Sequence, residues 1–214
     1  MRNVAVFDLD GTILKGTSAE HQLSMHLLKR GIVTPFHMSV FFLECLRLLA
    51  LGRRNDLRKN KFHLRRVSCS RVLDIIPDVC RTRLKPHFSP HVINRFHELK
   101  RQGFWTIILS GTPTFILDGL HEILPFDQGI GSEFEVNNST FTGYVTGIYP
   151  WHVGKVDALQ KHCGTMDIDY SQSCSFANKF SDIPLLEIFG YPVAVHPDAR
   201  LRNHARSHGW DIIE

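Results

Sequence analysis

A chain of 214 residues with a formal net charge of +4 has room for one sizeable domain, or for a core with a small insertion. Its 43% hydrophobic and 21% charged residues are ordinary for a soluble globular protein, and its longest apolar stretch, Met38–Leu51, is too short to span a bilayer. The five cysteines are odd in number and form no Cys-x-x-Cys pair, which argues against a disulfide framework and a zinc site. We therefore expect a soluble, cytoplasmic protein.

The first predicted element is a strand that begins at Val4, since its run of apolar, β-branched residues is typical of a buried strand. It stops at Asp8 and Asp10, which are followed by Gly11, a residue that allows a sharp turn. The carboxyl end of a central strand is where open α/β sheets bind ligands. There, one carboxylate can act as a nucleophile and the other as a general acid and base. The same tetrad is also typical of a plain acidic turn.

A helical block follows over residues 16–86, with apolar side chains such as Leu23 and Leu27 at helical spacing. From Ser89 onward, helices and strands alternate. We predict helices at about 89–102, 114–124, 153–163, 183–189 and 198–208 and strands at about 104–109, 173–176, 192–195 and 210–213, with a hairpin at about 133–146. This alternation indicates an α/β fold with a parallel sheet covered on both faces. The helical block directly follows the acidic strand end, where an insertion can act as a lid.

Two further segments carry groups suited to an anion. Ser110 and Gly111 follow the strand predicted at 104–109 and precede a helix, so a hydroxyl, free backbone amides and the helix dipole meet there. Lys155 lies near the start of another helix, where a cation is unfavourable unless a negative group lies opposite. Taken alone, the first pattern is also typical of a helix cap and the second of a solvated surface lysine.

The fourth segment, Ala177–Asp182, again ends a strand with hard oxygen ligands. Asn178, Ser181 and Asp182 have the carbonyl, hydroxyl and carboxylate oxygens that Mg²⁺ accepts. Asp182 can equally cap the helix predicted from Ile183, and one residue can serve both purposes.

In this order, and all at strand ends, the four segments resemble the motifs of the haloacid dehalogenase (HAD) superfamily, and specifically its phosphoserine-phosphatase-like branch, subfamily IB. The matching segments are Asp8–Ile13, Ser110–Thr112, Lys155 and Asn178–Asp182. The tail from Asp182 to Leu201 also resembles that branch. The resemblance implies a Rossmann-like three-layer α/β/α core with a mostly parallel sheet, formed by residues 1–15 and 87–214. It also implies a small helical cap, residues 16–86, inserted after the first strand.

The resemblance implies an activity as well, the Mg²⁺-dependent hydrolysis of a phosphomonoester. Asp8 would be the nucleophile that forms an aspartyl-phosphate, and Asp10 the general acid and base. The phosphate would be held by Ser110, Gly111 and Lys155. The metal ligands would be Asp8, Asp10 through its backbone carbonyl, Asn178 and Asp182.

One departure from the family pattern bears on this activity. The fourth motif of the branch reads Gly-Asp-x-x-x-Asp, whereas this chain has Asn178 in place of the first aspartate, followed by Lys179. If both side chains face the site, it is about two charges more positive than usual, which opposes the binding of Mg²⁺. The alternative hypothesis is therefore a catalytically weak or inactive HAD-like protein that binds phosphate or regulates a partner.

The predicted cap gives the available clues to the substrate. In phosphoserine phosphatases a glutamate nine residues after the nucleophile meets the substrate's amino group, but Thr17 occupies that spacing here and Glu20 lies about a turn further on. The cap also has nine basic residues between Arg47 and Arg71, Arg53 and Arg54 among them, against one acid. This charge favours a small phosphorylated substrate with several anionic groups.

The same charge also suits an anionic membrane surface, and the neighbouring apolar segment Phe36–Leu51 adds lipid phosphates to the alternatives. We interpret that segment as the cap's own core. We expect no nucleic-acid partner, because the basic run lacks interleaved aromatic residues and no recognition motif is present. The sequence leaves the oligomeric state and the physiological substrate open.

Overall fold

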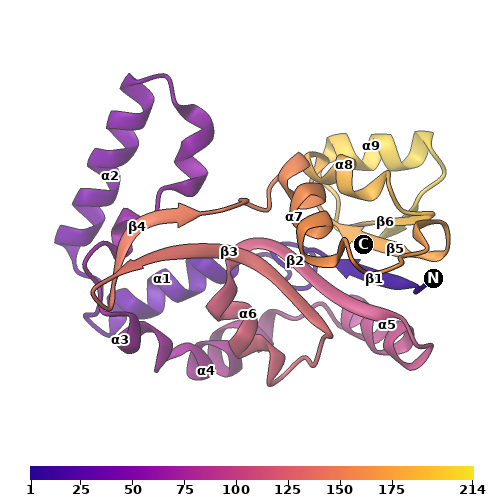
Figure 1. The fold of residues 1–214 in the computed structure, drawn as a ribbon, viewed down its shortest axis with the longest axis horizontal. Helices are drawn as coiled ribbons and strands as arrows, with labels where there is room; N and C mark the ends of the chain where they lie inside the picture. Colours follow the sequence, from indigo (N-terminus) through magenta and orange to yellow (C-terminus); the bar gives the residue numbers. More distant parts are fainter.

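The structure, a computed structural model, describes residues 1–214 and is built on one seven-stranded sheet (Figure 1). The strands lie in the order β4-β3-β2-β1-β5-β6-β7, and all neighbours are parallel except β3 and β4. Their bounds are β1 Val4–Phe7, β2 Trp105–Pro113, β3 Gln128–Asn137, β4 Thr140–Thr146, β5 Cys174–Ala177, β6 Tyr191–Val195 and β7 Asp211–Ile213. Strand β1, which ends in the acidic pair, therefore lies at the centre of the sheet.

Helices cover both faces of this sheet, and β1 shows why its sequence is continuously apolar. Its alternate residues point to opposite faces, so that Phe7 stacks on Phe176 with ring centroids 4.4 Å apart, while Val4 and Val6 pack on the other side. One face is covered by α5 (Pro90–Arg101) and α6 (Thr114–His121), and the other by α7 (Val153–Cys163), α8 (Ile183–Leu186) and α9 (Ala199–Ser207). This arrangement confirms the predicted three-layer α/β/α fold.

The structure differs from the predicted boundaries where β2 passes the site. The sequence predicts a strand that ends at Leu109, but β2 continues to Pro113 with a shift of register against β3. The extension has a tertiary cause, because Pro113 still pairs with Ser132, and the Ser132 hydroxyl donates to the Gly111 carbonyl at 2.6 Å. Two short 3₁₀ turns, Tyr170–Gln172 and Phe180–Asp182, flank β5.

Between β1 and β2 the chain forms the predicted helical insertion. Its elements are α1 Ala19–Lys29, α2 Pro35–Ala50, η1 Arg54–Lys59, η2 Phe62–Leu64, α3 Cys69–Leu73, α4 Ile76–Val79, η3 Cys80–Leu84 and η4 Lys85–His87. The chain leaves and re-enters the core side by side, since Ser89 N donates to Ile13 O and Lys15 N donates to His87 O, both at 2.8 Å. No helix combines the length and the apolar character needed to span a bilayer.

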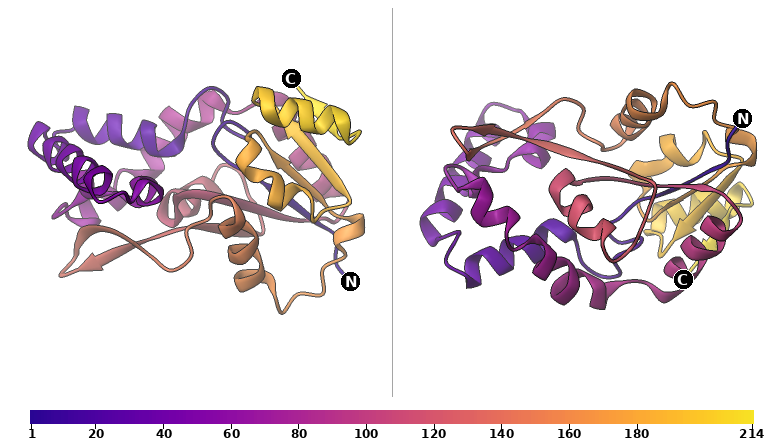
Figure 2. Two further views of the ribbon diagram at one scale, coloured as in Figure 1. Left: turned by 90° about the horizontal axis from the view of Figure 1, so that it is seen from above. Right: turned by 60° about the horizontal axis from the view of Figure 1, so that its bottom comes forward.

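The insertion also rests on the sheet through the β3–β4 hairpin, which extends to it from the edge of the sheet (Figures 1 and 2). Arg66 N donates to Phe141 O at 2.8 Å, and Lys61 N donates to Gly143 O at 3.1 Å. Gly143 has a φ of +90°, and a Cβ there would lie 2.9 Å from the ring of Phe62. Glycine at this position therefore allows the close approach of the hairpin to the insertion.

Helix α2 departs from the interpretation of Phe36–Leu51 as the core of the cap. Only Glu44 and Leu48 of this helix are buried, on the face that packs against η2. Its other face exposes large apolar side chains to solvent. The interpretation is therefore correct for the inner face of α2 and wrong for the outer one.

Candidate active site

The acidic pair lies where β1 ends. Asp8 is buried, and Thr12 donates to its Oδ2 at 3.3 Å. The turn after it depends on Gly11, whose φ is +85° and whose amide donates to Leu14 O at 2.8 Å. A Cβ on Gly11 would lie 2.0 Å from the Asn178 amide nitrogen. The glycine therefore both makes the turn and lets the strand end of β5 approach that of β1.

Lys155 joins the first carboxylate to the last. Its Nζ lies 2.7 Å from Asp8 Oδ1 and 2.9 Å from Asp182 Oδ1, and all three side chains are buried. Burial opposes the charge on Lys155, but the two carboxylates outweigh it and raise the pKa of the lysine. Burial also raises the pKa of Asp8, and Lys155 offsets part of that rise. The negative group that a lysine near a helix start requires is thus present.

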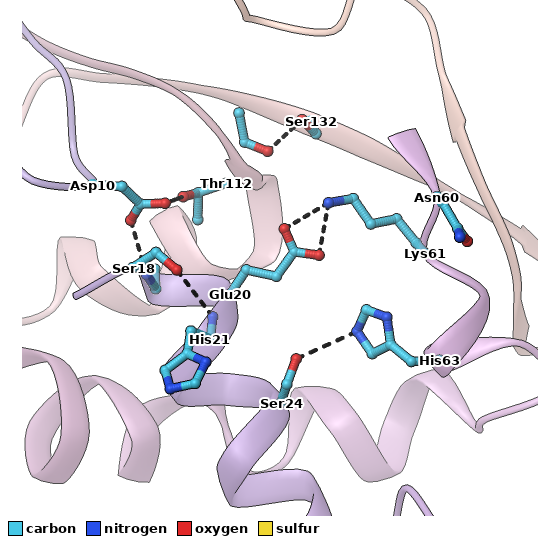
Figure 3. A network of polar contacts seen from close by, with 12 residues as sticks. Asp10, Ser18, Glu20, His21, Ser24, Asn60, Lys61, His63, Thr112 and Ser132 are labelled. Carbon is cyan, nitrogen blue, oxygen red and sulfur yellow. Dashed lines mark hydrogen bonds and ion pairs between the residues drawn. The ribbon is translucent and has the colours of Figure 1, made fainter. Parts of the chain in front are cut away.

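Asp10 has different surroundings and a different acidity. Its Oδ1 accepts a hydrogen bond from Ala19 N at 2.8 Å, and its Oδ2 accepts one from the Thr112 hydroxyl at 3.4 Å (Figure 3). Burial raises the pKa of Asp10 to about 7, and the negative charges of Asp8 and Glu20 add to the effect. A carboxyl group with this pKa can donate a proton in one step and accept one in the next near neutral pH.

Ser110 and Gly111 line the same cavity as the two aspartates. The buried Ser110 hydroxyl donates to Thr112 Oγ1 at 3.2 Å and accepts from Thr112 N at 3.3 Å. The predicted helix start near residue 114 is correct, since α6 begins at Thr114, but Ser110 lies inside β2 and not beyond the end of that strand. Its hydroxyl still faces the carboxyl end of the sheet, where it can donate to an anion.

The segment after β5 supplies a candidate oxygen ligand. Asn178 is buried, and its Oδ1 has no hydrogen-bond partner, which is unusual for a buried polar atom. It lines the same cavity as Asp8, Asp10 and Asp182. No group of three or more His, Cys, Asp or Glu side chains is arranged to hold a metal, so any cation site here also needs the Asn178 amide or backbone carbonyls. These hard oxygens fit Mg²⁺. The neighbouring Lys179 is exposed at the cavity wall.

The cavity has a volume of about 640 Å³ and takes its outer wall from three parts of the chain. The insertion contributes Glu20 and Arg58. The other outer lining residues include Tyr149, Trp151 and His152 before α7, and Arg200 on α9. Among the predicted cap residues, Glu20 thus reaches the cavity, whereas Thr17 lines a neighbouring one.

The two arginines predicted at the substrate lie elsewhere. Arg53 and Arg54 are exposed and do not line the cavity, and Arg53 pairs with Asp56 at 2.7 Å. Arg58 from the same basic run lines it instead, with its guanidinium 4.5 Å from the centre of the Trp151 ring. A run of basic residues gives no period from which to tell which side chain turns inward.

An ion pair within the insertion holds the cavity-lining residue Glu20 (Figure 3). Lys61 Nζ lies 2.6 and 2.7 Å from the two carboxylate oxygens of Glu20. Lys61 is 4% exposed, and its ammonium group lies over the rings of Phe134 and Tyr149. Nearby, burial lowers the pKa of His63 to about 4, so this histidine is neutral at physiological pH.

Three residues at or beside this site, Lys61, Thr112 and Tyr149, are not predicted from the sequence. Thr112 belongs to the predicted Ser110–Thr112 segment, so its hydroxyl is a candidate partner of Asp10. Lys61 is one of the nine basic residues of the predicted cap, and its apolar neighbours Phe62 and Leu64 are the available signal that this stretch is buried. Nothing in the sequence around Tyr149 marks it as part of a cavity.

The chain belongs to the haloacid dehalogenase-like hydrolase family, whose sequence model matches residues 5–187. A histidinol-phosphatase of Neisseria meningitidis is 27% identical over 222 residues, covering 100% of this chain and 99% of the relative. A phosphoserine phosphatase of Mycobacterium tuberculosis is 24% identical, covering 97% of this chain and 69% of the relative. These matches confirm the prediction of a HAD-type hydrolase of the phosphatase kind.

Solved structures share the fold. A protein of unknown function from Bordetella pertussis superimposes with a TM-score of 0.84 at 20% identity and covers 100% of this chain and 99% of its own. A substrate-bound phosphoserine phosphatase complex superimposes with a TM-score of 0.68 at 17% identity, covering 100% and 93%. Together with the family model and the phosphatase relatives, these structures confirm the predicted resemblance to the phosphoserine-phosphatase-like branch. Proteins of this family are generally Mg²⁺-dependent.

The acidity of Asp10 leads to a test of stability against pH. The folded state raises its pKa from 3.8 to about 7, so the stability cost of ionising it grows between about pH 4 and pH 7 and is complete above that range. Asp10→Asn removes the ionisation and keeps the acceptor for Ala19 N. In metal-free protein with EDTA, this variant should raise the Tm more at pH 8 than at pH 5. Equal shifts at the two pH values in thermal unfolding would contradict the assignment.

The two single variants that break the Glu20–Lys61 ion pair should differ in their loss of stability. Glu20→Gln leaves a buried ammonium group unpaired, whereas Lys61→Met leaves a carboxylate that is 26% exposed on its side chain. Breaking a buried pair costs about 3 kcal/mol or more, so Glu20→Gln should lower the free energy of unfolding by about that amount and Lys61→Met by less. Urea unfolding of both variants and of the double variant measures the difference. A larger loss in Lys61→Met would contradict the geometry.

Proposed function

We propose that this protein is a Mg²⁺-dependent phosphomonoester hydrolase that acts through an aspartyl-phosphate on Asp8. The observation that carries the proposal is the pairing of two unlike carboxyl groups at the end of β1. Asp8 is buried and fixed by Lys155, while Asp10 has a pKa of about 7. One is suited to attack and the other to proton transfer. The insertion of residues 16–86 would serve as the cap over a core formed by residues 1–15 and 87–214.

In the first step Asp8 attacks phosphorus, a bond forms from its carboxylate oxygen to phosphorus, and the ester P–O bond breaks. Lys155 holds Oδ1 of Asp8, so the more loosely held Oδ2 is the attacking atom. Asp10 gives its proton to the leaving oxygen. In the second step the ionised Asp10 takes a proton from water, the water oxygen attacks phosphorus, and Asp8 is released with inorganic phosphate.

Other groups hold the phosphoryl oxygens while charge spreads over them. The Ser110 hydroxyl and the backbone of Gly111 supply donors at the carboxyl end of β2, and Lys155 supplies a positive charge. Asp8, the Asp10 carbonyl, Asn178 and Asp182 would hold Mg²⁺. The ion would supply positive charge that offsets the repulsion between the phosphate and Asp8.

The substrate we propose is a small phosphorylated metabolite with a second anionic group. Three basic side chains that line the cavity, Arg58, Lys179 and Arg200, have no carboxylate within ion-pair distance. Both arginines stack on aromatic rings, Arg58 on Trp151 and Arg200 on Phe180, which fixes their planes. The five free cysteines support a reducing compartment such as the cytoplasm.

Activity and its metal dependence are tested together. Hydrolysis of an aryl phosphate should rise with Mg²⁺, and Asp8→Asn should lower kcat by at least about a thousandfold. Asn178→Asp should lower the half-saturating Mg²⁺ concentration, because it restores a negative charge beside the site. If the wild type is inactive at every Mg²⁺ concentration and Asn178→Asp is active, the phosphate-binding or regulatory alternative replaces the enzyme.

The second anionic group is tested with matched arginine variants. Arg58→Gln and Arg200→Gln should each lower kcat/KM for a phosphate ester that also bears a carboxylate or second phosphate by about tenfold, with little effect on an uncharged ester. Arg54→Gln changes the same charge outside the cavity and should leave both values unchanged. Equal losses for both substrates, or for all three variants, would contradict the proposal. Phosphoserine and histidinol phosphate belong in the panel because two relatives bear their names.

A further inference from the structure

The outer face of α2 carries most of the exposed large apolar residues of the insertion. Its exposed residues recur at helical spacing, so they lie along one side of the helix. They are Phe36, Phe42, Leu43, Leu46 and Leu49, followed by Leu51 just beyond the helix, with exposed fractions between 46% and 72%. Contiguous exposed apolar surface of this kind marks an interaction site in soluble proteins.

The position of α2 is fixed from its inner side. Leu48 is buried there, and Asn60 donates to the Phe41 carbonyl at 3.2 Å. Glu44 is buried as well and pairs with Arg47 at 2.6 Å. The helix therefore cannot rotate its apolar face inward without exposing these contacts. Figures 1 and 2 show that α2 lies at the outer edge of the molecule, at the end opposite the two chain termini.

Basic residues border this apolar face. Arg47 lies in the last turn of α2, Arg53 and Arg54 follow Leu51 and Gly52, and Lys59 lies on η1, which packs against α2; all four are exposed. The only acids over the same stretch, Glu44 and Asp56, are already paired with Arg47 and Arg53. Arg54 and Lys59 have no carboxylate partner. An apolar face bordered by unpaired cations is thus presented to the outside.

The positive charge beside the apolar face distinguishes between its two simplest binding partners, a second copy of the chain and a lipid surface. A second copy of the chain, docked by the same face, would bring the two basic borders together, and like charges at close range oppose association. An anionic lipid surface offers hydrocarbon to the leucine and phenylalanine side chains and negative head groups to the arginines and lysine.

We propose that the outer face of α2, together with Arg54 and Lys59 of η1, docks this protein reversibly on an anionic lipid surface. The apolar side chains enter the boundary between head groups and acyl chains, while Arg54 and Lys59 contact the head groups. The helix lies in the plane of the surface and does not cross it. This docking is independent of the phosphatase function and requires no residue of the active site.

The test is co-sedimentation with vesicles of phosphatidylcholine alone and of phosphatidylcholine with about a third phosphatidylglycerol. The wild type should bind the anionic vesicles and release them at high salt, since the attraction is screened. The double variant Leu43→Glu/Leu46→Glu should lose binding by at least about tenfold. Its control, Leu73→Glu/Val136→Glu, makes the same charge change at exposed apolar residues elsewhere and should bind more tightly than the α2 variant.

The basic border is tested with a second matched pair. Arg54→Gln/Lys59→Gln should weaken partitioning about tenfold or more, and Arg101→Gln/Lys161→Gln, which removes the same charge from α5 and α7, should weaken it clearly less. Circular dichroism and thermal unfolding check that each variant is folded. Absence of wild-type binding, equal binding to neutral vesicles, or equal losses in a variant and its control would overturn the proposal. A concentration-dependent dimer in light scattering that Leu43→Glu/Leu46→Glu abolishes would assign the face to a second copy instead.

Discussion

The buried ammonium group of Lys155 is the interaction on which the site depends. It lies between Asp8 and Asp182, which come from the ends of β1 and of the segment after β5. Burial raises the pKa of Asp8, and the positive charge of Lys155 offsets part of that rise. Since the lysine stands at the start of α7, it also ties the helix layer to two neighbouring strand ends. The Lys155 side chain therefore affects both the position of these strand ends and the balance of charge at the site.

The sheet makes this arrangement possible because it brings distant parts of the chain to one edge. Strand β1 pairs with β2 on one side and with β5 on the other, so Asp8 and Asn178, directly after β1 and β5, come to the same edge of the sheet as Ser110 of β2. Gly11 removes the side chain that would otherwise collide with Asn178. A glycine turn and three parallel strands thus bring together groups that lie far apart in the sequence.

The core and the acidic site could be predicted from the sequence because their signals are local. The apolar run before Asp8, the alternation of strands with helices and the short motifs each depend on a few neighbouring residues. What could not be predicted depends on contacts between distant segments. Strand β2 continues past Leu109 because β3 pairs with it, and Lys61 is buried because Glu20 and two aromatic rings surround it. Apolar residues lie on both faces of α2, Phe41 and Leu48 on the inner one and Phe42 and Leu46 on the outer one, so the sequence alone does not tell which face is covered.

Backbone hydrogen bonds join the insertion to the rest of the molecule at two separate places. One is the pairing of Ile13–Lys15 with His87–Ser89, and the other is the tip of the β3–β4 hairpin. A rigid rotation of the insertion about the first place would break the hydrogen bonds at the second. The hairpin tip and the insertion therefore behave mechanically as one body, joined to the sheet by a long two-stranded ribbon. Any movement of the insertion relative to the sheet, and with it any change in the cavity that Glu20 and Arg58 line, therefore requires this ribbon to twist or the hydrogen bonds at its tip to break.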